Sequence, residues 1–137
     1  RQVHSSLFIN TINFIHYLNK NEKYWILKYI RWELKFLSEL GFGLDLSKCA
    51  VTGSTNNLQF ISPKSGRAVS AEGASEWRNK LFILPKFFLL DNEYTDDKSE
   101  LLKGIKITTF FLNRYVSSIG LELPDVRDRF TNKLHKL

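Results

Sequence analysis

An unusually wide apolar face marks residues 24–40 and constrains the fold of the whole chain. When side chains are placed 100° apart, as on an α-helix, the apolar residues of this segment cover most of the circumference. The polar side chains share one arc, and they are Lys28, Arg31, Lys35, Ser38 and Glu39. A helix that is apolar on most sides must be buried on most sides, so the pattern predicts a central helix.

Glu33 falls in the middle of that apolar face. A carboxylate in such a place must be paired, hydrogen-bonded or protonated. We interpret Glu33 as a structural residue that ties the helix to a backbone turn or to an arginine such as Arg67. A general acid or base would need a neighbouring His, Asp or Lys in a cleft, and the sequence offers no obvious one.

Glycines end the central helix. Gly41 follows the last apolar position, where glycine can adopt the left-handed conformation that closes a helix, and Gly43 comes two residues later. The sequence then changes to short, turn-rich segments, with strand-like runs at residues 49–51, 58–61 and 67–69. Because so little sheet cannot stand alone, we expect a small β finger, at about residues 48–70, that rests on the helices.

Helical patterns flank this finger. Apolar residues recur at helical spacing over residues 3–19 and 101–119, and Pro124 opens a last helix. Residues 70–84 predict a short helix or a helical turn. The mostly acidic segment 91–98 is the best candidate for disorder.

Size and composition fit one folded domain. We expect residues 1–137 to form a single mainly α domain, a helical bundle with a small β-hairpin insertion. No apolar run is long enough to span a membrane, so we expect no membrane partner. The single cysteine fits a reducing, cytoplasmic setting. The net charge of +6 favours an acidic partner, with nucleic acid first.

Cations form three strips on the predicted helices, and these strips are the candidate binding residues for DNA or for an acidic peptide. Two readings stay open for them: they contact phosphates or carboxylates, or they only form a solubilising face. The strips consist of Lys28, Arg31 and Lys35; of Lys103, Lys106 and Arg114; and of Arg127, Arg129, Lys133 and Lys136.

Motifs of enzymes do not occur in the sequence. We find no phosphate-binding loop, no nucleophile elbow, no HExxH and no Cys/His set at metal spacing. The three histidines lie far apart, and no carboxylate pair stands out as an acid–base couple. We therefore expect a protein that is not an enzyme and has no cofactor.

The turn CAVTG resembles a zinc-ribbon knuckle that has lost its ligands. Thr52 stands where a second cysteine would follow Cys49, and the region of Ser70 and Gly73 supplies no second knuckle. A structural zinc site needs four ligands, so we expect no metal and a buried, inert Cys49. Apolar packing should then hold the finger together, through Val51, Phe60, Ile61 and Val69.

Ordered segments along the chain carry a resemblance to a known family. The segments are RWELKFLSELGFGLDLSKCAVTG (Arg31–Gly53), FISPKSGRAVS (Phe60–Ser70), LFILPKFFL (Leu81–Leu89), TTFFLNRYV (Thr108–Val116) and LPDVRDRF (Leu123–Phe130). With them the chain resembles the C-terminal helical domain of the RecO family of bacterial recombination mediators, in the alphaproteobacterial form without zinc ligands. Other members of the family have four cysteines at the knuckle, so zinc dependence does not carry over to this chain. The family also carries an N-terminal OB-fold domain, which we expect to be missing from residues 1–137.

The resemblance implies a role in DNA repair and homologous recombination. The family binds single- and double-stranded DNA, anneals complementary strands and, with RecR, helps RecA to load on DNA covered by single-stranded DNA-binding protein. It docks the acidic C-terminal tail of that protein on its helical domain, and it would act in the cytoplasm, at the nucleoid during repair. The alternative is a protein-interaction scaffold that docks this tail or RecR without direct DNA binding.

Overall fold

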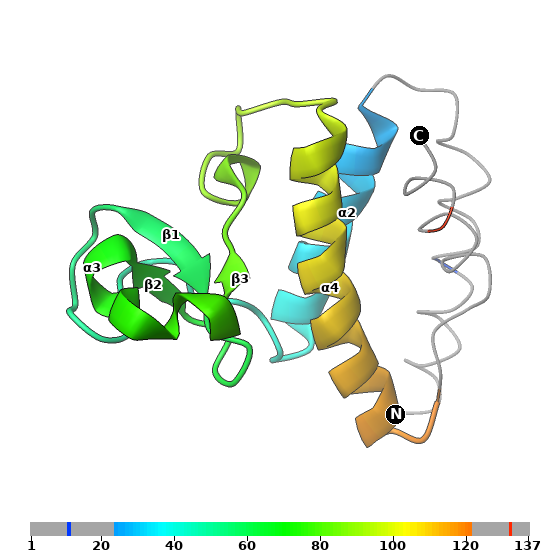
Figure 1. The fold of residues 1–137 in the computed structure, drawn as a ribbon. Helices are drawn as coiled ribbons and strands as arrows, with labels where there is room; N and C mark the ends of the chain where they lie inside the picture. Colours follow the sequence, from blue (N-terminus) through cyan, green and yellow to red (C-terminus); the bar gives the residue numbers. More distant parts are fainter. Residues whose placement is uncertain (1–10, 12–23, 122–131, 133–137) are drawn as a thin grey trace.

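The computed structural model describes residues 11, 24–121 and 132, and Figure 1 shows the arrangement of their helices and strands. The predicted fold class, mainly α with a small β insertion, is confirmed. Apart from residues 11 and 132, the helices expected at residues 3–19 and after Pro124 lie outside the described residues, together with the last strip of cations. The elements are α2 (Trp25–Glu39), β1 (Leu58–Ile61), β2 (Ala68–Ser70), α3 (Ala71–Ala74), η1 (Ser75–Lys80), β3 (Phe82–Ile83), η2 (Lys86–Phe88) and α4 (Lys98–Ser118).

Helices α2 and α4 lie side by side, and the finger projects to one side of them (Figure 1). Both helices run in the same direction, so the finger and the segment after it form the crossover between them. Their shared core is apolar, and Leu27, Ile30, Leu37, Ile105 and Leu112 are among its buried members. Glu33 is also fully buried in α2, while its pairing with Arg67 stays a prediction.

The end of α2 explains why two glycines follow it. Gly41 has φ +85°, its N–H donates to the carbonyl of Ser38, and the N–H of Phe42 donates to the carbonyl of Leu37. This is the Schellman pattern, which satisfies carbonyls that would otherwise lack partners. Gly43 is required for a different reason: a Cβ there would lie 2.7 Å from the backbone Cα of Ser38.

The finger is a three-stranded antiparallel sheet in the order β2-β1-β3, not a simple hairpin. Strand β3 was not predicted, and it pairs with β1 through only two residues. The strand predicted at residues 49–51 is wrong, because this segment is a turn. The prediction that Val51 packs the finger is also wrong, since its side chain is 67% exposed, whereas Ile61 and Val69 are buried.

Segment 91–98, predicted as the best candidate for disorder, leads into α4 and is in contact with α2. The ring of Tyr94 packs edge-on against Tyr24, with 5.4 Å between ring centroids. Helix α4 begins at Lys98, three residues before the predicted start. In the part of the chain that the structure describes, no helix is both long enough and apolar enough to cross a membrane.

Candidate functional site

A groove along α4 is lined by three lysines and by apolar side chains. Its volume is about 840 Å³. The partly buried Leu102 supplies apolar surface, and Lys98, Lys103 and Lys106 bring positive charge to the lining, which favours an anion. Such a combination suits a ligand with an apolar part and a carboxylate or phosphate. The described residues that line it are Lys98, Ser99, Leu102, Lys103, Ile105, Lys106 and Thr109.

The rim of this groove contains two predicted residues and one that sequence reasoning missed. Lys103 and Lys106 were assigned to one strip, and the structure places both at the groove. Lys98 was missed because the predicted helix began at Leu101. The polar residues before Leu101 contained a usable signal. Acidic residues such as Asp97 and Glu100 are typical of the first turn of a helix, and a helix that starts there includes Lys98.

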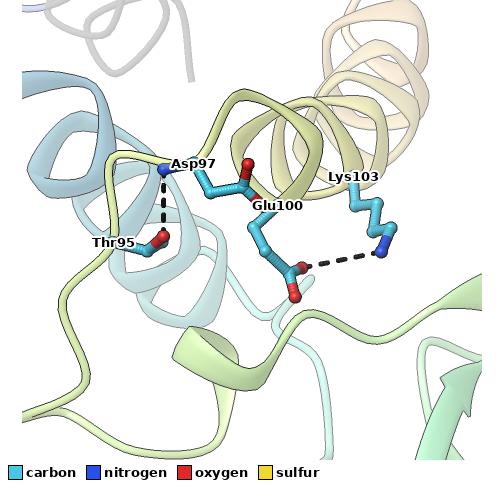
Figure 2. Close-up of polar contacts among 4 residues, drawn as sticks. All are labelled: Thr95, Asp97, Glu100 and Lys103. Carbon is cyan, nitrogen blue, oxygen red and sulfur yellow. Dashed lines mark hydrogen bonds and ion pairs between the residues drawn. The ribbon is translucent and has the colours of Figure 1, made fainter.

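One carboxylate balances part of the positive charge at the rim. Figure 2 shows Glu100 directed toward Lys103, with 3.8 Å between the carboxylate oxygen and the ammonium nitrogen. On the preceding segment, the Thr95 hydroxyl accepts a hydrogen bond of 3.0 Å from the N–H of Asp97, which orients the start of α4 (Figure 2). Both side chains are part-buried, and an i,i+3 ion pair on a helix contributes only about 0.2–0.5 kcal/mol to stability, so an incoming anion can compete for Lys103.

Arg31, predicted as a binding residue of the first strip, contacts backbone carbonyls. Its Nη2 donates to the carbonyls of Phe87, at 3.2 Å, and Leu90, at 2.9 Å, and also to that of Glu93. Its guanidinium lies 5.0 Å from the ring centroid of Tyr94. The guanidinium therefore holds the segment between η2 and α4 against α2, and fewer of its donors are left for a ligand.

Lys28 and Lys35, the other members of the first strip, are exposed on α2. Lys35 and Arg31 border a second notch of about 430 Å³ between α2, η2 and the segment after α2. Asp91 also lines this notch. Because Arg31 is engaged by carbonyls and Asp91 repels anions, the groove on α4 is the better candidate for an anion site.

Arg114, the third member of the second strip, bridges α4 and the finger. Its Nη2 donates to the carbonyl of Pro63 at 2.7 Å, and its Nη1 donates to that of Lys64 at 3.4 Å. The guanidinium also lies 4.8 Å from the ring centroid of Phe110. It therefore fixes the turn between β1 and β2 to the helix, although the side chain keeps an exposed surface.

Cys49 is buried at the base of the finger, where its sulfur accepts backbone hydrogen bonds. Its Sγ lies 3.3 Å from the nitrogens of Val51 and Thr52 and 3.2 Å from that of Ser70. Burial raises the pKa of the thiol, but the hydrogen bonds from Ser70 and Thr52 outweigh it and lower the pKa to about 6. A Cβ at Gly73 would lie only 2.8 Å from this sulfur, so glycine is needed there.

The residues around Cys49 do not fit a zinc site. Cys49 is the only cysteine in the chain, and Thr52, Ser70 and Gly73 surround it. Within residues 24–121 and the two other described positions, no three His, Cys, Asp or Glu side chains come together as a metal site would require. One sulfur cannot supply the four ligands of a structural zinc ion.

These features define the class of the protein: a small, mainly helical domain with a β insertion between two parallel helices and a lysine-rimmed groove on one of them. The family model described as "Recombination protein O C terminal" matches residues 1–122. The chain therefore belongs to the RecO family.

Curated proteins named DNA repair protein RecO are similar to the chain. It is 42% identical to that of Ruegeria sp. (strain TM1040), over 83% of this chain and 47% of the relative. It is 48% identical to that of Bartonella bacilliformis, over 72% of this chain and 40% of the relative. For Cereibacter sphaeroides the values are 40% identity, 98% of this chain and 56% of the relative. The chain thus spans about half the length of the curated relatives it matches, and no solved structure matches it.

Proposed function

We propose that this domain acts in DNA repair as part of a recombination mediator. In this proposal the protein binds single- and double-stranded DNA, promotes annealing of strands, and helps RecA to load on DNA covered by single-stranded DNA-binding protein, together with RecR. Membership of the RecO family and the names of the relatives support a repair role. The observation that carries the binding role is the groove on α4 with Lys98, Lys103 and Lys106 at its rim.

DNA binding is the part of this proposal that a salt titration tests. If about five cations contact phosphates, log K for duplex DNA falls with log salt at a slope of about −4 to −5, because bound phosphates release condensed counterions. Fluorescence anisotropy with labelled duplex and single strands measures this slope. A slope near zero, or no binding at low salt, would contradict phosphate contacts by this domain.

The second candidate function is docking of an acidic peptide without direct DNA binding. The groove favours it, because Leu102 offers apolar surface for a terminal aromatic side chain while the lysines that line the groove attract the free carboxylate. The probe is a synthetic peptide with the tail chemistry of single-stranded DNA-binding protein: acidic residues, an aromatic side chain and a free C-terminus. Gel shift with DNA beside anisotropy with this peptide separates the two functions. Peptide binding without DNA binding would favour the scaffold role.

A further inference from the structure

The segment η1, between α3 and β3, presents an indole ring to solvent. None of its six residues is buried, and Trp77 is 55% exposed. A tryptophan ring is large and apolar, and burying it is favourable, so a tryptophan this exposed on a small element is informative. Because η1 contributes no buried side chain, packing of the core does not explain Trp77.

Cations accompany the aromatic rings at this place. The ammonium of Lys80 lies 5.1 Å from the ring centroid of Trp77. The guanidinium of Arg78 lies 5.8 Å from the ring centroid of Phe60 on β1, and its Nη2 donates to the carbonyl of Ala71 at 3.0 Å. The carbonyl fixes Arg78, whereas Lys80 carries a flexible ammonium that can leave the ring for an anion.

An exposed ring with cations beside it matches one ligand chemistry in particular. Single-stranded nucleic acid offers unstacked bases with a π-face and, one sugar away, a phosphate. A duplex hides the faces of its bases, so it offers only the phosphates. An acidic peptide binds best in a groove, and the lysine-rimmed groove for such a ligand lies on α4.

We propose that η1 is a stacking platform for single-stranded nucleic acid, in which a base stacks on Trp77 while Lys80 and Arg78 contact the neighbouring phosphates. This inference rests on the proposed DNA binding and names residues of the finger that carry part of it. Glu76, the neighbour of Trp77, is exposed on the same element, and its negative charge would repel phosphates. Glu76→Gln is therefore expected to tighten binding modestly, because it removes a like charge.

The test compares wild type, Trp77→Ala and Trp77→Phe for binding to an oligo(dT) strand and to a strand of equal length with abasic sites. We expect Trp77→Ala to weaken oligo(dT) binding by about tenfold, since stacking on an aromatic ring is worth about 1–3 kcal/mol per base. Trp77→Phe keeps a ring and should keep most of the affinity. The abasic strand should bind wild type and Trp77→Ala equally. Val51→Ala, which removes an exposed apolar side chain without a ring, is the matched control and should change nothing.

The outcomes separate this inference from the proposed function. Unchanged oligo(dT) affinity in Trp77→Ala, with clear binding by wild type, overturns the platform and leaves DNA binding in place. Equal losses on oligo(dT) and on the abasic strand also overturn stacking. Failure of the wild-type protein to bind any strand at low salt overturns both the stacking platform and the proposed DNA binding. Thermal unfolding checks that Trp77→Ala is folded, which we expect because η1 buries no residue.

Discussion

Arg31 contacts three backbone carbonyls and one aromatic ring across the gap between α2 and the segment before α4. Its planar fork can satisfy several acceptors at once, which a lysine ammonium on a flexible stem does less well. We expect Arg31→Lys to lower the free energy of unfolding by about 1–2 kcal/mol, the typical worth of charge-assisted hydrogen bonds that are partly exposed. Urea unfolding measures the loss. Lys35→Ala, on the same arc of α2, is the control and should cost little, and equal stability of wild type and Arg31→Lys would contradict a structural role.

Cys49 gives stability a dependence on pH. The pKa of its thiol is lowered from 9.0 to about 6 in the folded protein, so between these values the folded state holds a thiolate and the unfolded state a thiol. The unfolded state then binds more protons, and stability rises with pH across this window and is lost as pH falls toward about 6. Cys49→Ser removes the titrating group. The difference in unfolding free energy between wild type and Cys49→Ser should therefore grow from pH 6 to pH 9, and a constant difference would contradict the thiolate.

Single residues also show where sequence reasoning stops. Helical spacing placed Arg31 and Arg114 on outward arcs, but it contains no information on the carbonyls of Phe87 and Pro63, which come from segments more than fifty residues away. Both arginines therefore looked like binding residues, although they also join elements. Lys103 and Lys106 could be grouped from sequence, because neighbours on one helix need no tertiary information.

The packing of α4 against η2 depends on Gly104. In the interior of a helix, alanine is usually more stable than glycine by about 1 kcal/mol. Here a Cβ at position 104 would lie 2.7 Å from the ring of Phe87, which is buried and cannot move away easily. Overpacking typically costs about 1–3 kcal/mol, so we expect Gly104→Ala to be net destabilising by about 1 kcal/mol.

Thermal unfolding of Gly104→Ala beside Ser117→Ala tests this packing. Ser117 is exposed on the same helix, so its replacement reports helix propensity without a clash. A higher stability of Gly104→Ala than of wild type would show that η2 can shift away from α4 at little cost.

Elements with long periodic patterns were predictable, and short ones were not. The predicted helix at residues 24–40 became α2, Trp25–Glu39, because its apolar positions and its glycine stop both lie in the local sequence. Strand β3 has two residues, too few for any pattern, and exists because β1 offers it a free edge. The turn after Cys49 was predicted as a strand. Backbone N–H groups of this turn donate to the sulfur of Cys49, and such hydrogen bonds cannot be inferred from the spacing of apolar residues.

At the scale of the whole molecule, a net charge of +6 attracts any polyanion. Binding at a specific site must therefore be distinguished from attraction by the overall charge, the general field of the molecule. Lys28→Glu on α2 and Lys106→Glu on α4 change the net charge equally, but only Lys106 lines the groove. If the groove is the site, Lys106→Glu weakens binding of the acidic peptide by about tenfold or more, as truncating a paired charge does, while Lys28→Glu has a small effect. Equal effects of the two variants would favour the general field.

Removing the charge of Glu100 also tests whether the groove is the peptide site, because this change should strengthen binding. The carboxylate of Glu100 forms an ion pair with the ammonium of Lys103, at 3.8 Å. Glu100→Gln removes this ion pair and keeps the size of the side chain. Because an i,i+3 ion pair on a helix is worth about 0.2–0.5 kcal/mol, the acidic peptide should bind up to about twofold more tightly to Glu100→Gln. Fluorescence anisotropy at two salt concentrations measures the affinity of the peptide for both proteins. The gain in affinity should shrink at high salt, because screening of the charges increases. A gain of the same size in Glu39→Gln, which removes an exposed carboxylate from α2, would mean that the net charge, and not Lys103 at the rim of the groove, sets the affinity.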